Sequence, residues 1–530
     1  MKSEAYQITN PVLPGFFPDP SICRVGDDYY LVNSSFEWFP GVPVHHSRDL
    51  AHWRLIGHIL TRQSQLDLRG VPDSGGVWAP SLSHADGQFW LIYTNLRNTG
   101  LGRPFKDIKI FLTTAPDILG PWSDPIELNS IGFDPSLFHD DGGRKWLVNM
   151  MWDFRKDRNR FAGIVLQEYD HQVGRLVGPM SRILAKPVLT EGPNLYKRDG
   201  WYYLLLAEGG TGWNHGISMA RSRSITGPYE LDPQASVLTA RDDYGLALQK
   251  AGHGELVETP AGEWYLVHLA SRPISPKRRC ILNRETCLQK VEWSGDGWLR
   301  LAAGGHHPRE TWPAPHGLVE CAWAVTPACD HFEDEALDSS WNSLRVPVEE
   351  TWLSLRERAG WLRLRGRDSL HSPFEQSLVA KRLSGFRCRA ETCLEFHPTH
   401  FTQMAGLICT YNSRNHIYLC VTHHEVDGVV LGIVATENGN YDELGMSRVP
   451  IESWERMYLR ADIDHERLQF SASPDGDAWQ PVGPVLDASK LSDDYGQGFT
   501  GAMTGLCAQD LGGTRTPADF DYFSLWVDVD

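Results

Sequence analysis

The sequence predicts an all-β protein in two parts: a five-bladed β-propeller over residues 1–305 and a jelly-roll β-sandwich over 330–530, joined by a linker at 306–329. Three observations predict this division. A hairpin pattern recurs five times before residue 305, the pattern is absent afterwards, and short alternating strands separated by turns replace it. With 530 residues, of which 41% are hydrophobic and 22% charged, the chain is long and apolar enough for two such units.

The recurring unit is a pair of short strands around a tight turn. Its second strand appears as DDYYLVNSS (27–35) and returns as GQFWLIYTN, GRKWLVNMM, GWYYLLLAE and GEWYLVHLA, so a shared Leu recurs every 56 to 62 residues. Turn dipeptides such as Asp86-Gly87 and Asp199-Gly200 precede it. Strand-and-turn stretches between the copies predict a second, outer hairpin, and five four-stranded units in a ring form a propeller. A solenoid would need capping repeats and simpler copies, which the sequence lacks.

The same repeat position carries carboxylates in two of the copies. In each copy, one position lies just before the first strand. In the five copies it holds Asp19, Ala79, Asp134, Gly192 and His253, and Glu191 lies one step before this position in the fourth copy. Pseudo-fivefold symmetry brings these positions to one end of the central channel. An Asp before Pro is by itself most often a turn former. Several acids around one channel raise each other's pKa, and such clusters are more often functional sites than accidents.

Three convergent carboxylic groups suit the cleavage of a glycosidic bond. One group protonates the leaving oxygen, one acts on water or on the anomeric carbon, and a third near the acid helps to keep it protonated. The residue pattern alone does not say which acid does what.

Other residues near this ring are candidates for contact with a sugar. Trp78 adjoins the ring, and Phe36 and Trp152 lie in loops after hairpins, where an aromatic ring can stack on a sugar face. Arg284, after the last hairpin, can return to the channel mouth. For His253, a structural hydrogen-bonding role and a ligand or water-orienting role remain equally open.

Charge and composition exclude several classes of partner. Lys and Arg number 50 against 67 for Asp and Glu, so the net charge of −17 repels nucleic acid and anionic membrane surfaces. The first residues, MKSEAYQITNPVLPG, contain one Lys and no apolar core, so they do not predict a signal peptide. The ten Cys are scattered and predict reduced thiols, which together favour a cytoplasmic enzyme.

At this point the motifs point to a family. The strings VLPGFFPDPSI (12–22), GGVWAPSL (75–82), GFDPSLFHDDGGRKW (132–146), TEGPNLYKRDGWYYLL (190–205) and GHGELVETPAGEWYLVH (252–268) closely resemble glycoside hydrolase family 43, in particular its two-domain β-xylosidases. The resemblance covers essentially the whole chain. It implies an exo-acting, inverting enzyme that releases D-xylose from the non-reducing ends of 1,4-β-xylo-oligosaccharides.

The resemblance also implies roles for residues. Asp19 is then the general base, Asp134 the residue that tunes and orients the acid, and Glu191 the general acid. Phe36, Trp78, Ala79 and Arg284 are expected around the non-reducing sugar, with Trp152 near the leaving-group sugar. His253 is expected to orient water or to help hold a calcium ion in the channel. No cofactor is expected to be required, and a homo-oligomer, dimer or tetramer, is expected.

The second part has two interpretations. A sandwich after a propeller can be a carbohydrate-binding module. In the resembling β-xylosidases it is instead a concanavalin-like domain that packs on the propeller and helps close the pocket. YGQGFTGAM (495–503) is the candidate closing loop, with Phe499 expected at the pocket and Met503 as the alternative.

Three other functions remain open at this stage. The nearest is a mainly α-L-arabinofuranosidase activity. The second is a retaining fructosidase, which shares the two-part architecture. The third is a non-catalytic sugar-binding propeller, in which the acids would be dispensable.

Overall fold

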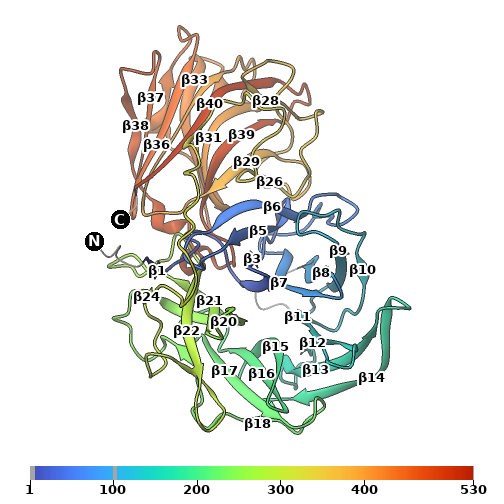
Figure 1. Ribbon diagram of the computed structural model, residues 1–530. Helices are drawn as coiled ribbons and strands as arrows, with labels where there is room; N and C mark the ends of the chain where they lie inside the picture. The colour runs from blue at the N-terminus through green and yellow to red at the C-terminus, as the bar shows by residue number, and fades with distance from the viewer. Residues whose placement is uncertain (1–5, 99–103, 529–530) are drawn as a thin grey trace.

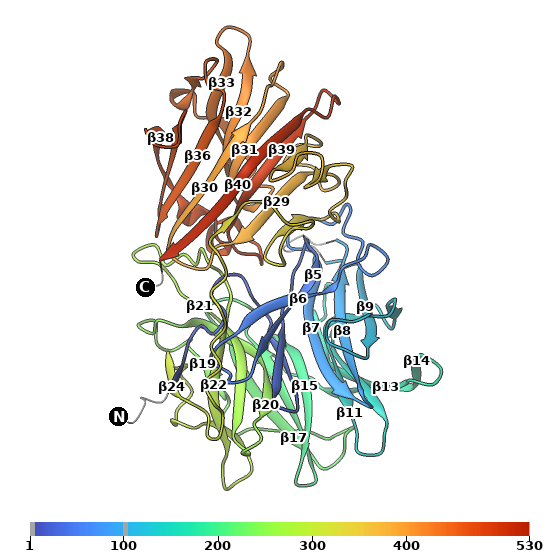
Figure 2. The same cartoon turned by 45° about the horizontal axis from the view of Figure 1, so that its top comes forward.

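The computed structural model describes residues 6–98 and 104–528, which form two all-β units stacked on each other (Figure 1). The N-terminal unit is a ring of sheets and the C-terminal unit is a sandwich placed over one side of the ring (Figure 1 and Figure 2). Within the described residues, no helix has the length and apolar character needed to cross a bilayer.

The predicted five-bladed propeller is confirmed. Each blade is an antiparallel sheet whose first strand lies innermost. The first blade contains β2 (Ser21–Val25), β3 (Asp28–Val32), β5 (Gly41–Ser47) and β6 (Arg54–Leu60), and the second contains β7 (Gly76–Ala85), β8 (Gln88–Leu96), β9 (Ile108–Ala115) and β10 (Ile126–Glu127). The third contains β11 (Gly132–His139), β12 (Lys145–Trp152), β13 (Phe161–Asp170) and β14 (Arg175–Leu184), and the fourth contains β15 (Thr190–Arg198), β16 (Trp201–Glu208), β17 (Gly216–Ser222) and β18 (Glu230–Leu231), with β19 (Leu238–Thr239) also on β17. The fifth contains β20 (Gln249–Glu258), β21 (Trp264–Ser271), β22 (Glu285–Trp293) and β23 (Leu299–Leu301).

The segment predicted as a linker is partly ordered against the propeller. Within it, β24 (Thr311–Pro313) pairs with β1 (Gln7–Thr9), so the two ends of the propeller sequence hold each other. Further along, the backbone N–H of Cys321 donates to Asp49, and the indole of Trp323 donates to the His52 carbonyl. The chain leaving the fifth blade therefore runs back over the first blade before the sandwich begins.

The C-terminal unit is the expected β-sandwich. One sheet contains β27 (Leu353–Ser354), β28 (Leu362–Arg365), β40 (Pro517–Asp528), β30 (Arg387–Glu395), β36 (Met457–Asp464), β37 (Arg467–Ser473) and β38 (Gln480–Asp487), with β25 (Cys329–Asp330) on β40. The other contains β34 (Asn440–Glu443), β33 (Gly428–Glu437), β32 (Asn415–His424), β31 (Gln403–Asn412), β39 (Met503–Asp510), β29 (Ser377–Arg382) and β26 (Asn342–Leu344), with β35 (Val449–Pro450) on β33. The helical turns are η1 (Gly445–Ser447), η2 (Ala488–Lys490) and α1 (Asp493–Gly496).

The two units are joined more intimately than their sequences predict. β4 (Trp38–Phe39), which lies between two strands of the first blade, pairs with β26 and so extends a sandwich sheet. The buried Arg345 of the sandwich donates to the Val71 carbonyl at 2.6 Å and to Asp73 at 2.8 Å. Because a buried cation must be matched by acceptors, this contact fixes the sandwich against the rim of the propeller.

All ten cysteines are free thiols, eight of them buried, as the scattered spacing predicts. Burial raises the pKa of the Cys409 thiol to about 12, so this thiol stays protonated and unreactive at neutral pH.

Candidate active site

The acids reach the channel because the backbone turns left-handed at the repeat position. Asp19, Asp134, Gly192 and His253 have φ of 50°, 52°, 55° and 43°. In blades two to five, the pairing of the innermost strand with its neighbour shifts register at this point, which is a β-bulge. A bulge re-aims a side chain that would otherwise lie on the face of the blade. Left-handed φ in a non-glycine residue is strained, and such strain gathers at functional sites.

Gly192 shows why one copy has no side chain at this position. A Cβ there would lie 3.0 Å from Nε2 of His253, and the φ of 55° also favours glycine. The place that a fourth-blade side chain would take is therefore filled by the fifth-blade histidine.

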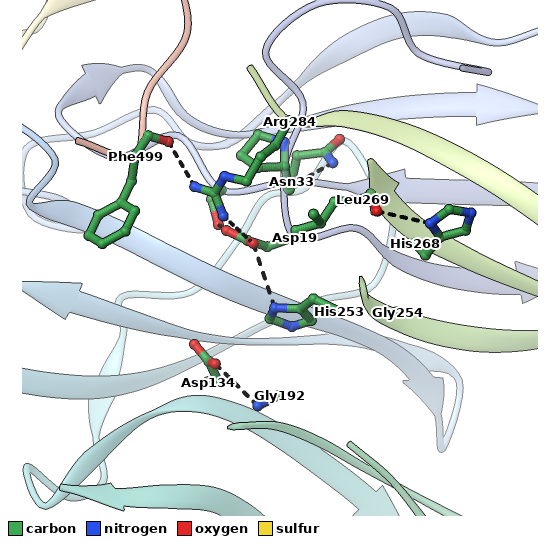
Figure 3. A network of polar contacts seen from close by, with 12 residues as sticks. Asp19, Asn33, Asp134, Gly192, His253, Gly254, His268, Leu269, Arg284 and Phe499 are labelled. Atoms are coloured by element: carbon green, nitrogen blue, oxygen red, sulfur yellow. Dashed lines mark hydrogen bonds and ion pairs between the residues drawn. The ribbon is translucent and has the colours of Figure 1, made fainter. Parts of the chain in front are cut away.

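Asp19 lies in a cage of hydrogen-bond donors (Figure 3). The Arg284 guanidinium donates to Asp19 Oδ1 at 2.7 Å, and the Ser34 hydroxyl donates to Oδ2 at 2.6 Å. Both the Asp19 and the Arg284 side chains are buried. Charge-assisted hydrogen bonds from a cation and a hydroxyl compensate the charge of this buried carboxylate and hold it in one orientation.

Glu191 and Asp134 lie in the opposite environment. Burial and the nearby Asp19 carboxylate raise the pKa of Glu191 to about 7, although Arg284 and Lys106 oppose the shift. Burial and the neighbouring Glu191 and Asp19 raise the pKa of Asp134 well above its usual range. The backbone N–H of Gly192 donates to Asp134 at 3.2 Å. This side of the pocket therefore retains a proton at neutral pH.

His253 lies between the two sides. Its Nδ1 is 3.6 Å from Asp19 Oδ1, beyond a direct hydrogen bond (Figure 3). Burial lowers the pKa of His253, with Arg284 adding to the effect and Asp19 opposing it, so the ring is neutral. A neutral imidazole beside the carboxylate can orient a water molecule.

The donors around His253 do not by themselves make a calcium site. Calcium takes six to eight oxygen ligands. His253 offers a nitrogen, and both oxygens of the nearest carboxylate, Asp19, already accept from Arg284 and Ser34. These residues therefore do not fit a calcium ion on their own.

The three acids share one pocket of about 290 Å³ with aromatic walls. Of the residues predicted from sequence, Phe36, Trp78, Trp152, His253, Arg284 and Phe499 also line it. The Trp78 and Phe133 rings meet edge to face at 5.4 Å, and Phe36 lies 5.7 Å from Phe16. Ala79 differs: it is buried in β7 and is not among the residues that line the pocket, so its predicted contact with the sugar stays a prediction.

Two cations in the pocket were not predicted from sequence. Lys106 lies over the rings of Trp78 and Trp152, 5.1 and 5.0 Å from their centroids, and burial lowers its pKa, with Glu191 opposing the shift. Arg160 also lines the pocket. Both lie in connections between blade strands, which have no counterpart at a repeat position. Phe133, directly before Asp134, carried a usable signal because it occupies the repeat position of Glu191 and Trp78.

The sandwich closes the pocket with Phe499. Its ring stacks on Phe36 at 6.4 Å and meets Trp78 edge to face at 5.5 Å. Its carbonyl accepts from Arg284 at 2.7 Å, so the guanidinium joins the sandwich loop to Asp19 (Figure 3). Met503, the alternative, is instead buried in the sandwich on β39.

Ser74 holds this loop against the propeller. Its hydroxyl accepts from the Phe499 N–H at 2.9 Å, and its carbonyl accepts from the Trp78 indole at 2.9 Å. Its own N–H donates to Glu37, whose pKa burial and the neighbouring Asp73 raise to about 8. One serine therefore sets the positions of two pocket aromatics.

An aromatic pocket that gathers one carboxylate bound by a guanidinium and two carboxyl groups with raised pKa values defines a hydrolase of the two-carboxylate kind that cleaves glycosidic bonds. Comparison with known proteins gives the family. Residues 8–299 match the model for glycosyl hydrolases family 43, and residues 329–525 match that for the beta xylosidase C-terminal concanavalin A-like domain. The chain belongs to glycoside hydrolase family 43.

Relatives cover nearly the whole chain. It is 47% identical to the xylosidase/arabinosidase 43B of Humicola insolens over 98% of this chain and 97% of that protein. It is 45% identical to the xylan 1,3-beta-xylosidase of a Vibrio species over 97% of this chain and 98% of that protein. The crystal structure of the xylan beta-1,4-xylosidase from Bacillus halodurans C-125 superposes with a TM-score of 0.95 at 54% identity, covering 98% of this chain and 99% of that one.

Proposed function

We propose that the protein is an exo-acting β-xylosidase that releases D-xylose from the non-reducing ends of 1,4-β-xylo-oligosaccharides with inversion at the anomeric carbon. The observation that carries this proposal is the contrast between Asp19, which accepts from the Arg284 guanidinium, and Glu191, whose pKa burial and Asp19 raise to about 7 in the same pocket. The names of the relatives support xylose as the sugar.

In the proposed step, Asp19 takes a proton from water as the water oxygen attacks the anomeric carbon. The bond to the leaving oxygen breaks, and Glu191 gives that oxygen its proton. Asp134 tunes and orients this acid. An inverting site needs room for water, so we expect roughly 6.5–9.5 Å between the Asp19 and Glu191 carboxyl groups.

We assign the residues that line the pocket to two sugar sites. Phe36, Trp78 and Arg284 would surround the non-reducing xylose, and Trp152 with Phe499 would contact the leaving-group sugar. Because the sandwich loop closes one side, a chain end can enter but a chain interior cannot pass through, which supports exo action. Lys106, over both tryptophan rings, is close enough to Glu191 to bias its protonation.

The test is the product itself. Proton NMR during early turnover of an aryl β-D-xylopyranoside, whose leaving group is not a sugar, should show α-D-xylose as the first product. Initial appearance of β-D-xylose would contradict inversion and favour a covalent intermediate, as in the retaining alternative.

Two specificities compete with the proposal. Arabinofuranosidase activity is favoured by the dual name of the Humicola relative, and a 1,3 linkage by the name of the Vibrio relative. We expect kcat/KM to be higher for the aryl β-D-xylopyranoside than for the aryl α-L-arabinofuranoside, and higher for 1,4- than for 1,3-linked xylobiose. The opposite order in either pair would replace that part of the proposal.

Three further expectations complete the proposed function. No cofactor is required, so dialysis against a chelator should leave xylobiose hydrolysis intact; loss of activity restored by calcium would instead support a calcium ion at His253. The ten free thiols support a reducing, cytoplasmic location. A homo-oligomer is proposed, which light scattering on the purified chain would test.

A further inference from the structure

A cluster of metal-binding side chains lies in the propeller away from the pocket residues. Asp242 is exposed in the connection between β19 and β20, and the half-buried His306 and His307 follow the fifth blade. Nε2 of His306 is 2.8 Å from Asp242 Oδ2, and Nε2 of His307 is 2.9 Å from Oδ1. We call these three residues the Asp242 cluster.

The geometry of the Asp242 cluster is close to that of a metal site. The three ligand atoms lie within 4.8 Å of one another. Ligands at about 2.0–2.1 Å around a tetrahedral ion are roughly 3.3 Å apart. The two histidine nitrogens already lie near this ligand-to-ligand distance from the Asp242 oxygens. A small movement of the rings away from the carboxylate would make room for an ion.

The cluster is also held in place before any ion binds. The His306 and His307 rings pack edge to face with centroids 4.6 Å apart. The His306 carbonyl accepts from the Thr239 N–H at 2.8 Å, which fixes the backbone of the second segment beside the first. A preformed site loses less conformational entropy on binding.

The charge of the cluster favours a cation. Hydrogen bonds from His307 and His306 lower the pKa of Asp242 to about 2, so the carboxylate is ionised at neutral pH. The ion pairs that Asp242 makes within the described residues are those with these two histidines. When both rings are neutral the site keeps one negative charge, in a protein of net charge −17.

We propose that the Asp242 cluster binds one divalent transition-metal ion of the zinc type. Two imidazole nitrogens with one carboxylate suit zinc, nickel or copper better than calcium or magnesium, which prefer oxygen ligands. The rings would bind as neutral imidazoles with the proton on Nδ1, and water would complete the coordination. Binding would weaken as the pH falls and protons compete for the rings.

Such an ion would tie the connection that leads into β20 to the segment that leaves the fifth blade. Because β20 carries His253 and the leaving segment begins the linker, the ion would clamp the fourth and fifth blades together. Ligands that bind only the folded state stabilise it. The effect expected is on stability, since none of the three residues lines the catalytic pocket.

The test is zinc titration of the full-length, untagged, chelator-treated protein by isothermal calorimetry, with thermal unfolding measured in parallel. We expect one zinc ion per chain with a micromolar Kd and a rise of several degrees in Tm. His306→Ala/His307→Ala and, separately, Asp242→Asn should abolish both effects while keeping normal hydrolysis of an aryl xyloside, which shows that the variants fold.

The sandwich offers a matched control. His423 and His424 are also adjacent, and His424 pairs with Asp427 at 3.0 Å. His423→Ala/His424→Ala should bind zinc as the wild type does. The proposal is overturned if the wild type takes up no zinc, if the His306→Ala/His307→Ala variant binds as tightly as the wild type, or if bound zinc acts by inhibiting hydrolysis, which would place it at His253.

Discussion

The carboxyl groups on the two sides of the catalytic pocket have different surroundings. On one side, Asp19 accepts from a guanidinium at 2.7 Å and a hydroxyl at 2.6 Å. On the other, Asp134 accepts one backbone N–H at 3.2 Å, and burial raises the pKa of Glu191 to about 7. Asp19 and Asp134 occupy the same repeat position and have nearly the same φ. The neighbours, rather than the backbone, therefore make the surroundings of these two acids different.

The largest loss of activity is expected when Asp19 is replaced. Asp19→Asn leaves no group to deprotonate water, so kcat/KM for xylobiose should fall by about 10⁴-fold or more. Binding of xylobiose, measured by calorimetry, should survive. Asp27→Asn, at the exposed turn of the same hairpin, is the control and should behave as the wild type. Substantial turnover by Asp19→Asn would mean that another base operates.

Replacing Glu191 should slow hydrolysis by an amount that depends on the leaving group of the substrate. Glu191→Gln cannot donate a proton, so hydrolysis of xylobiose should fall by about 10²–10⁴-fold. An aryl xyloside with an acidic phenol as leaving group needs less protonation and should lose much less. Equal losses on both substrates would contradict the assignment of Glu191 as the acid, and unchanged hydrolysis would revive the non-catalytic interpretation.

Replacing Arg284, the cation that binds Asp19, should lower kcat/KM by an intermediate amount. Arg284→Met leaves Asp19 buried without its cation and frees the Phe499 carbonyl. Losing one partner of a buried ion pair costs several kcal/mol, so kcat/KM should fall by about 10²–10³-fold. Steady-state kinetics across pH should show the loss growing towards acid pH. A loss that is uniform across pH would indicate that Arg284 only binds sugar.

The smallest effect is expected at the contact between the two units. Ser74→Ala removes the acceptor of the Phe499 N–H, a hydrogen bond worth about 1 kcal/mol. KM for xylobiose should rise about fivefold with kcat nearly unchanged. Ser413→Ala is the matched control, because its hydroxyl donates to Asp73 across the same interface without touching the loop. Equal effects of both variants would show that interface stability, rather than the position of Phe499, is responsible.

The sequence predicted those features that repeat. The five hairpins and the positions of Asp19, Asp134 and Glu191 follow from a recurring pattern, because symmetry maps each copy onto the same end of the channel. Lys106 and Arg160 lie in the connections between the second and third strands of two blades, outside the recurring hairpin, so the repeat does not locate them. The strand β4 was also missed, since its partner β26 lies some 300 residues away and only the packed interface selects it.

The sequence alone did not show which of several neighbouring residues reaches the pocket, and the structure was needed to distinguish them. Phe499 and Met503 lie in one loop region, and only the start of β39 shows that Met503 turns into the sandwich. Ala79 shares the repeat position of the acids but is not among the residues that line the pocket, so symmetry alone does not decide which members of the ring face the sugar.

The most direct test of the account is the protonation of Glu191. Carbon-13 NMR of protein labelled at the glutamate carboxyl carbons follows each group through its titration. Glu37 and Glu255 are also buried with raised pKa values, so the Glu191 resonance is assigned as the one missing from Glu191→Gln. We expect this resonance to titrate with a pKa of about 7. Titration near the ordinary glutamate value of about 4.3 would contradict it.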